Sequence, residues 1–354
     1  MSILFPSKAF IITALSPKLS HDTLKEKKMS SDKIDRRKFL KLLGYSSLFL
    51  TLPTTEGCQD ELPNTTSYVS LVKNSDESYA ISKAIELIEG LDFLSPGDSV
   101  LLKLALNSPN LFPSTTSPFV VSELTRLLKD RGAGEVFVGD KSPTWQDTMN
   151  CLEETGISQA ASDAGAQIVV FEDDDMVQVK PEGAIHWPQG FSMPNLFNQV
   201  DHIITLPTLR THMMAGFTMG MKIFVGAIPQ SDRSLMHGSL NFSECIAEIP
   251  LCTDKIRLSL LDARQGFNSG GPDSGNLISP GIVIASKDLV AADATGLALL
   301  KTIGTTPGLM ITSVWNHRII KRGVDSLSPS LSSETLTLLS EGIDNIDEIK
   351  AQLS

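Results

Sequence analysis

Residues 203–222 read IITLPTLRTHMMAGFTMGMK. The first four residues are apolar or β-branched and predict a strand, which Pro207 ends because proline cannot donate to a ladder. The segment from His212 to Lys222 is mostly apolar, yet an ionisable side chain stands at each end. Two interpretations stay open for this segment: a ligand site, or a buried connection with a hydrogen-bonded histidine and a lysine that reaches water.

Smaller features of the same stretch favour the ligand site. Gly216 and Gly220 permit dihedral angles closed to other residues and let a backbone come close to a ligand. A strand, a glycine-bearing turn and the start of a helix also point free N–H groups at an anion. A third ionisable group, His237, follows fifteen positions after Lys222. His212, Lys222 and His237 therefore form one candidate set.

Outside this stretch, segments typical of strands alternate with segments typical of helices. Apolar runs predict strands at 68–72, 100–106, 135–140, 167–171, 255–261 and 282–285. Helical periodicity predicts helices at 80–88, 119–130, 149–161, 239–248 and 289–300. This alternation predicts an α/β fold with a mainly parallel sheet and helices on both faces, in one domain or two lobes. The remaining C-terminal part reads as helices and loops.

Polar residues stand where several predicted strands end, which is the edge where α/β sheets bind ligands. Lys103, inside an apolar strand, either pairs with a carboxylate or reaches that edge. His212 and Lys222 are the candidate catalytic residues, because histidine exchanges protons near neutral pH and lysine holds an anion or forms an adduct. The candidate substrate-binding residues are Lys103, Asn107, Asp140, Thr211, Gly216, Gly220 and Asp262.

The N-terminal part has the pattern of a twin-arginine export signal. Arg36 and Arg37 lead into Phe-Leu-Lys, and a moderately apolar run follows up to Pro53. That run is shorter than the ~20 residues of a stable membrane span. We predict that the protein uses the twin-arginine machinery and reaches the periplasm of a bacterium. The alternative is a basic amphipathic helix on a cytosolic protein.

The domain boundaries follow from this signal. Residues 1–58 are expected to form the export signal and linker, with translation starting at Met29, and residues 59–354 the α/β domain. Cys58 offers a lesser alternative, lipid anchoring, although the residues before it fit a lipoprotein cleavage site poorly.

The acidic net charge and the absence of several sequence motifs argue against several classes of function. Formal net charge is -11, and residues 1–58 hold ten Lys and Arg against five Asp and Glu, whereas the rest holds 20 against 36. An acidic body argues against nucleic acid as a partner, because phosphate binding requires a basic surface. The four cysteines form no C-x-x-C pair, so no iron–sulfur cluster is expected; whether Cys245 and Cys252 pair stays open. The glycine motifs of dinucleotide oxidoreductases, P-loop NTPases and serine hydrolases are absent from the sequence.

Over about residues 95–300 the sequence resembles domain of unknown function family 362. The residues that carry the resemblance are Lys103 to Asn107, Thr115 to Pro118, Leu206 to His212, Lys222 with Gly226, His237, and the loop from Gly271 to Gly275. The chain departs from the family pattern at Ile223, where asparagine is usual, and at Thr208 and Arg210, where lysines are commoner. Some relatives in this family carry iron–sulfur modules.

The segment from His212 to His237, with A-G-F-T at 215–218 and Lys222 between, is also similar to the nickel-pincer lactate racemase family. The resemblance implies that His212 is a catalytic base, Lys222 tethers the pincer cofactor and His237 binds nickel. Asp140 stands where that family has its second catalytic histidine, so two-base racemisation requires Asp140 to substitute. The arginine that binds the substrate carboxylate has no clear match.

Together these observations predict an exported enzyme with a strand-end pocket for a small anionic or hydroxy-acid substrate. The resemblance implies a racemase or isomerase that depends on a nickel-pincer cofactor or another metal. A non-catalytic periplasmic protein that binds a ligand or cofactor is the alternative, which the missing second histidine favours. The sequence leaves the substrate, the reaction and the oligomeric state open.

Overall fold

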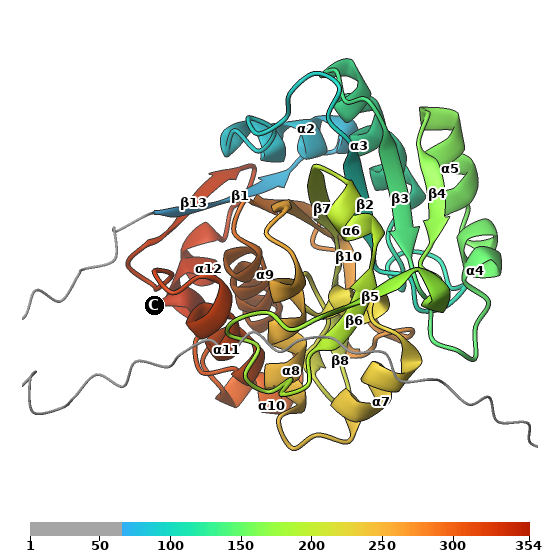
Figure 1. Cartoon of the computed structure of the whole chain (residues 1–354). Helices are drawn as coiled ribbons and strands as arrows, with labels where there is room; N and C mark the ends of the chain where they lie inside the picture. The colour runs from blue at the N-terminus through green and yellow to red at the C-terminus, as the bar shows by residue number, and fades with distance from the viewer. Residues whose placement is uncertain (1–65) are drawn as a thin grey trace, which may run out of the picture. The chain divides into compact units, whose positions relative to one another are not determined.

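A large sheet runs through the protein, whose structure is a computed structural model that describes residues 66–354 (Figure 1). These residues belong to one compact unit, so the two-lobe alternative does not apply to them. The strand order is β13(Leu336–Glu341), β1(Ser67–Lys73), β12(Ile282–Ser286), β10(Ile256–Gly270), β7(His202–Leu206), β2(Val100–Leu104), β3(Val136–Asp140) and β4(Gln167–Val170). The predicted export signal, Met29 and Cys58 lie outside the described residues.

Most neighbouring strands are parallel, which confirms the predicted fold class. β4, β3, β2, β7 and β10 follow one another in parallel, and β13 is parallel to β1. β12 is antiparallel to both of its neighbours, β1 and β10. The apolar run of β2 is buried on both faces, with Leu101 in one hydrophobic cluster and Leu102 in the other.

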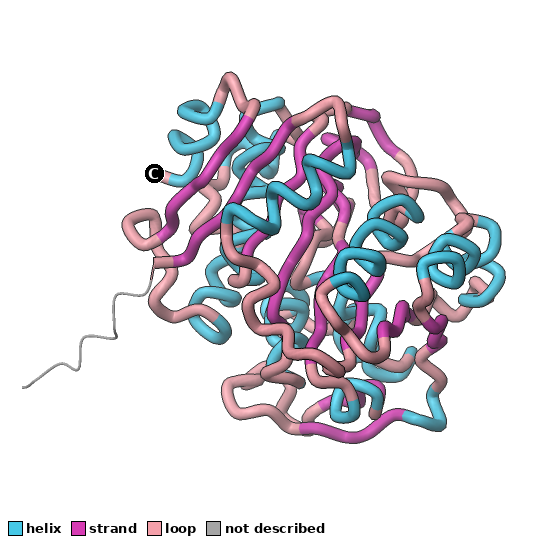
Figure 2. The backbone as a smooth tube through the Cα atoms, turned by 90° about the horizontal axis from the view of Figure 1, so that it is seen from above, coloured by secondary structure: helices cyan, strands magenta, loops and turns pink. Residues whose placement is uncertain are grey.

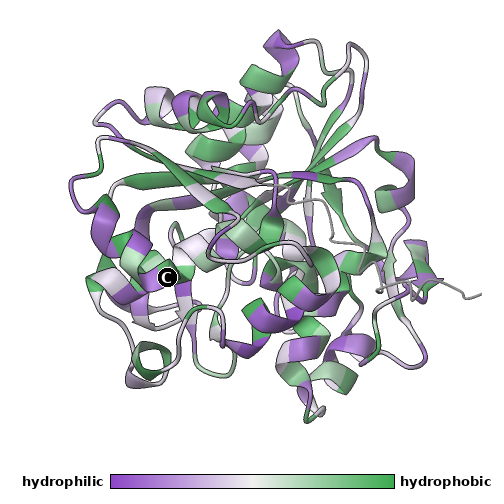
Figure 3. Ribbon diagram, turned by 90° about the vertical axis from the view of Figure 1, so that its left-hand side faces the viewer, coloured by the Kyte–Doolittle hydropathy of each residue, from purple (hydrophilic) through white to green (hydrophobic). Residues whose placement is uncertain are grey.

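Helices cover both faces of the sheet, as Figure 3 shows. On one face α2(Glu77–Leu87) packs on β1 and β12, while α3(Pro118–Asp130) and α5(Ile157–Ala164) pack on β3 and β4. On the other face α9(Leu289–Ile303) lies on β10, β12 and β1. Two further helices, α11(Arg318–Leu327) and α12(Ile346–Leu353), pack on α9 from outside. In Figure 2 the strands lie side by side with helices over them.

Local sequence signals explain where several helices begin and end. Asp288 precedes α9 and accepts hydrogen bonds from the N–H groups of Val290 and Ala291 at 2.9 and 3.0 Å. The single helix predicted at 149–161 is two, α4(Thr148–Glu154) and α5, because Gly156 takes a left-handed φ of 76° between them.

Two strands differ from the prediction. β10 was expected to end at Asp262 but extends for 15 residues to Gly270, and it turns into β11(Gly275–Ile278) as a hairpin. The glycine-rich segment at 266–275 is therefore mainly paired backbone. β13 lies in the C-terminal part where only helices and loops were expected, and its pairing partner is β1 at the opposite end of the described chain.

Pro207 ends the strand that contains Ile203, as predicted, but the chain re-enters the sheet directly after it. β7 ends at Leu206, and after Pro207 the chain continues as β8(Thr208–His212), which pairs with β10 in parallel. β8 turns back antiparallel into β9(Gly216–Phe217). A short 3-10 helix, η2(Lys222–Ala227), follows, and then α7(Gln230–His237) and α8(Phe242–Glu248).

The shorter elements complete the described chain. They are η1(Asp173–Asp175), β5(Met176–Val179) paired with β6(Phe191–Pro194), α6(Leu196–Gln199), η3(Ile249–Cys252) and α10(Pro307–Ile311). Cys245 and Cys252, whose pairing the sequence left open, are free thiols. Of the helices in residues 66–354, none is both long and apolar enough to cross a membrane.

Candidate functional site

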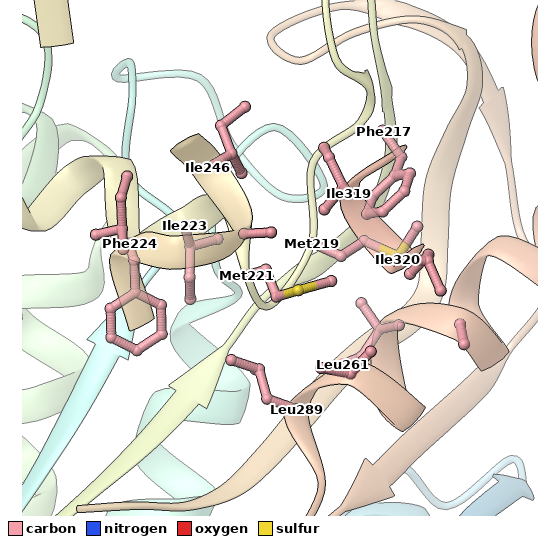
Figure 4. Close-up of a cluster of buried hydrophobic side chains, with 14 of the residues drawn as sticks. Phe217, Met219, Met221, Ile223, Phe224, Ile246, Leu261, Leu289, Ile319 and Ile320 are labelled. Carbon is pink, nitrogen blue, oxygen red and sulfur yellow. The ribbon is translucent and has the colours of Figure 1, made fainter. Parts of the chain in front are cut away.

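The stretch that follows β8 alternates between two environments. Phe217, Met219 and Met221 are fully buried and point into the hydrophobic cluster drawn in Figure 4. Thr218 and Lys222, which alternate with them, line a cavity. Only Gly216 and Phe217 are extended here, because residues 219–221 form a bend and turn and Met221 has helical backbone angles, φ -65° and ψ -42°. The apolar residues thus anchor this stretch in the core and hold Lys222 at the wall of the cavity.

Asp293, on α9, fixes the backbone immediately before Lys222. Its carboxylate accepts hydrogen bonds from the N–H groups of Gly220 at 2.6 Å and Met221 at 2.9 Å. Burial raises the pKa of Asp293 to about 7, although the two hydrogen bonds oppose the rise. A Cβ at Gly220 would lie 2.8 Å from Oδ1 of Asp293, so this position requires glycine. Gly220 is therefore a structural residue, and its N–H group faces α9 and not a ligand.

The cavity has a volume of about 360 Å³ and lies between the ends of β2, β3 and β8 and the segment η2–α7. The structure brings five of the ten predicted site residues to it: Asn107, Asp140, His212, Lys222 and His237. Other lining groups that the sequence did not single out are Lys141, Arg210, Arg233 and Asp273. The cavity thus gathers His212, Lys222 and His237, the candidate set that the sequence suggested, at one place.

Three cations of the cavity have no carboxylate partner. Arg210, Arg233 and Lys222 are 1, 5 and 8% exposed, and none of them forms an ion pair with a carboxylate of residues 66–354. Burying an unpaired charge normally costs several kcal/mol. Asp273 also lines the cavity and its charge acts on Arg210, but it lies outside ion-pair distance, so an entering anion would give these three cations a direct partner.

Arg210 is only partly satisfied by hydrogen bonds from the described residues. Nη1 donates to the carbonyl oxygens of Ser114 and Pro272 and, at 3.3 Å, to Oδ1 of Asn107. Nη2 has no hydrogen-bond partner among the described residues, and Nε is buried without one. Burial lowers the pKa of Arg210 to about 10. Because Nε is inaccessible, Nη2 is the atom of Arg210 that can donate a charge-assisted hydrogen bond to a ligand.

Arg233, on α7, is held by backbone carbonyl groups. Nε donates to Ile228 at 2.9 Å, Nη1 to Ser142 at 3.1 Å and Nη2 to Lys141 at 2.8 Å. One hydrogen of each Nη atom is left over after these bonds. This role of Arg233 has no local sequence signal, because the carbonyls of Lys141 and Ser142 that orient it come from the loop after β3, far away in the chain.

Lys222 has neither a hydrogen bond nor an ion pair with any residue between 66 and 354. Burial, together with the positive charges of Arg210 and Arg233, lowers the pKa of its amine from 10.5 to about 7. At neutral pH a large share of Lys222 is therefore an uncharged amine. Such an amine can act as a nucleophile or, once protonated, as the partner of an anion.

The two histidines of the cavity present different ring nitrogens. Nδ1 of His212 accepts hydrogen bonds from the N–H groups of Met214 and Ala215 at 3.1 and 3.3 Å. Burial, and then the charges of Lys222 and Arg210, lowers the pKa of His212 to about 3, so its ring is neutral. A neutral ring that accepts at Nδ1 carries its hydrogen on Nε2. His212 is therefore a hydrogen-bond donor.

His237 has the opposite arrangement. Its Nδ1 lies 2.7 Å from the carbonyl oxygen of Arg233, which only accepts, so Nδ1 is the donor. In the neutral ring Nε2 then holds a free lone pair. Nε2 has no partner in the described part of the chain, and the ring packs on Phe242 with 5.2 Å between centroids. His237 is the histidine able to accept a proton or bind a metal.

Lys103 and Asp140 form a buried ion pair beneath the cavity. Nζ of Lys103 lies 2.9 Å from Oδ1 of Asp140 and donates to the carbonyls of Leu104 and Ile223. Asp140 also accepts from the N–H groups of Leu106 and Lys141. Of the two roles open to Lys103, pairing is the one observed, and Asp140 contributes mainly to holding β2, β3 and η2 together.

Three other predicted substrate-binding residues do not line the cavity. Asp262 is bound by Arg264, two positions along β10 on the same face, with contacts of 2.9 and 2.8 Å. The hydroxyl of Thr211 donates a hydrogen bond of 3.4 Å to the carbonyl oxygen of Gly270. Gly216 lies against His317, and its φ of 80° is the reason for a glycine there. Asp262 was expected at the ligand-binding edge because a strand was predicted to end there, but β10 continues past it to Gly270.

The turn between β10 and β11 forms part of the cavity rim. Asp273 accepts hydrogen bonds from the Nδ2 group of Asn107 and, at 2.9 Å, from the hydroxyl of Ser108. Its backbone carbonyl accepts from Ser114 at 2.7 Å. These bonds tie the hairpin to the loop after β2. Asn107 thus reaches the cavity, but its amide is engaged by Asp273 and Arg210.

The residues present fit the implied nickel-pincer group only in part. Lys222 offers a free amine for a tether and His237 a free Nε2 for a metal. His212 does not fit as a base, since its Nε2 already carries the hydrogen. Among residues 66–354, no three His, Cys, Asp or Glu side chains are grouped so as to hold a metal ion by themselves.

The chain is similar to a known protein in sequence, to a solved structure in fold, and to the model of a protein family. A thylakoid-associated protein of Synechocystis sp. is 27% identical over 219 residues, which are 57% of this chain and 63%, less than two thirds, of that protein. The lactate racemase apoprotein from Thermoanaerobacterium thermosaccharolyticum is a structural match with TM-score 0.39 and 14% identity, over 64% of this chain and 56% of that one. The model of the family described as Domain of unknown function (DUF362) matches residues 100–298, a segment that includes every residue lining the cavity, and the chain belongs to this family.

Proposed function

We propose that the cavity binds a small carboxylate, of which a 2-hydroxy acid is the simplest case, and that the chain is an enzyme that transfers a proton on it. One observation carries the proposal: Arg210 and Lys222 bring unpartnered cationic donors to the same cavity. A carboxylate accepts a hydrogen bond from Nη2 of Arg210 and gives the buried cations of the cavity the carboxylate partner that they lack within the described chain.

The two histidines support proton transfer with divided roles. His237 is the acceptor through Nε2, and His212 donates its Nε2 hydrogen to an oxygen of the ligand. This assignment differs from the resemblance to lactate racemases, which made His212 the base. Positioned acid–base groups contribute typically ~10²–10⁴-fold to a rate. We therefore expect His237→Gln to lower turnover by a factor in this range and to leave ligand binding nearly unchanged.

A direct assay is exchange of the C2 hydrogen of L- or D-lactate in deuterium oxide, followed by nuclear magnetic resonance. The proposal predicts incorporation of deuterium by the full-length protein, slower incorporation with His237→Gln, and weakened binding with Arg210→Gln. Ser234→Ala is a matched control, because Ser234 lines the cavity but its hydroxyl bonds only within α7. If lactate binds and no exchange occurs with any enantiomer, proton transfer on hydroxy acids is wrong.

The second candidate is a binding protein without turnover, and Asp140 favours it. This residue stands where the racemase pattern has its second catalytic histidine, yet it is fully paired with Lys103. It therefore cannot act as a free second base. Binding without exchange supports this candidate, and a stoichiometric metal in the native protein supports a metal-dependent enzyme instead. Export through the twin-arginine route is part of either proposal and rests on Arg36 and Arg37.

A further inference from the structure

Three buried lysines lie in the described part of the chain, and they differ in what they contact. Lys103 is paired with Asp140, and Lys301 donates to three backbone carbonyls at 2.9 Å each. Lys222 has no partner among residues 66–354 and is the one whose side chain lines the cavity. Because no neighbouring group of the described chain binds the amine of Lys222, this amine is free to react with a ligand in the cavity.

We propose that Lys222 forms a covalent Schiff base with a 2-oxo carboxylic acid bound in the cavity. This inference rests on the proposed function, since it uses the same carboxylate site, and it names a substrate class with a reactive carbonyl group. The carboxylate of the ligand accepts a hydrogen bond from Nη2 of Arg210, which lines the cavity. Its C2 carbonyl is then held among Lys222, His212 and His237, all of which line the same cavity.

The reaction is a condensation that needs no further reactant. The lone pair of the Lys222 nitrogen attacks C2, and the C–O double bond becomes a C–O single bond. His237 takes a proton from the nitrogen through Nε2, and His212, as a donor, stabilises the oxygen. The second nitrogen-bound hydrogen and the one held by His237 leave with the oxygen as water. A carbon–nitrogen double bond remains.

The surroundings of Lys222 favour the attacking form of the amine. Burial and the nearby charges of Arg210 and Arg233 lower its pKa to about 7, so the uncharged amine is abundant at neutral pH. A lysine in a low-polarity site beside another cation is a known way of activating an amine nucleophile. Lys103 and Lys301 cannot act as nucleophiles in the same way, because the amine of Lys103 is in an ion pair and that of Lys301 donates to backbone carbonyls.

The test uses the full-length protein, pyruvate as the probe and sodium borohydride as the trap. Reduction converts a Schiff base into a stable secondary amine, which intact mass spectrometry detects and peptide mapping locates. We expect one reduced pyruvyl adduct per chain, on Lys222, at millimolar pyruvate. Lys222→Met should abolish the adduct. Lys141→Arg should retain it, because Lys141 lines the cavity but its amine bonds to Phe171 and Asp173.

L-lactate, which has no carbonyl group, separates the two proposals. If lactate and pyruvate both bind but no adduct is trapped, the Schiff base is wrong and the carboxylate site stands. If neither binds, the proposed function itself fails. Adducts spread over surface lysines and unchanged in Lys222→Met overturn the inference. So does a native protein whose Lys222 already carries a covalent group, a result that favours a tethered cofactor.

Discussion

At the scale of the residue, the unpaired state of Lys222 has a consequence for stability. Its pKa is lowered in the folded protein, so between pH 7 and 10.5 the unfolded chain holds a proton that the folded chain lacks. Stability therefore rises with pH across this window, and below pH 7 the full cost of burying the charge is present. Lys222→Met removes that cost.

We expect Lys222→Met to raise the free energy of unfolding at pH 6, by on the order of a few kcal/mol, and the gain to shrink toward pH 10. Lys301→Met is the matched control, because it removes three hydrogen bonds to carbonyls and should lower stability by ~1–3 kcal/mol. Urea unfolding at several pH values measures both. A Lys222→Met variant less stable than the wild type at pH 6 would assign this lysine a structural role.

At the scale of the element, β2, β3 and η2 depend on one buried ion pair. Asp140→Ala leaves Lys103 charged, fully buried and without its carboxylate, which typically costs ~3–5 kcal/mol. Gly226→Ala should have a similar effect, since a Cβ there would lie 2.0 Å from Oδ1 of Asp140. Replacing both partners, as in Lys103→Met with Asp140→Leu, should cost less than Asp140→Ala alone.

Thermal and urea unfolding of these variants checks the assignment. The observation that would count against it is an Asp140→Ala variant that keeps its stability and loses only ligand binding, as expected for a substrate-binding residue.

Some elements were predictable from the sequence because their signals are local. The apolar run forms β2 itself, and Asp288 immediately precedes the helix that it caps. β13 was missed because its partner, β1, is at the other end of the described chain and supplies the pairing. Arg210 was missed for a related reason: Ser114 and Pro272, which orient it, are remote in sequence. His212 was found because it follows a predicted strand, whereas Lys222 and His237 were found as ionisable residues downstream of it and through the resemblance to known families.

At the scale of the whole molecule, the signal at Arg36 and Arg37 predicts where the protein acts. The twin-arginine route carries folded proteins, which suits a chain whose cavity forms only when β2, β3, β8 and α7 come together. Replacing both arginines by lysine should retain the protein in the cytoplasm. Cell fractionation with immunoblotting measures this, with Lys33→Arg as a control outside the pair. An unchanged distribution between fractions would show that the signal interpretation is wrong.

The cavity also makes ligand binding a property of the whole fold, because Arg210, Lys222 and Arg233 come from β8, η2 and α7. An anion beside Lys222 favours its protonated form and raises the pKa of its amine from about 7. Binding at pH 8 should therefore take up protons, and the affinity should fall as pH rises above 7. At pH 6 the amine is already charged, so uptake should vanish.

Calorimetric titration of L-lactate into the full-length protein, in buffers of different ionisation enthalpy, measures this uptake directly. We predict uptake of up to one proton at pH 8, little at pH 6, and weak binding without uptake for Lys222→Met. Binding of lactate to Lys222→Met with unchanged affinity, or binding to the wild type at pH 8 without proton uptake, would contradict the account of Lys222 as the unpaired cation that receives the ligand.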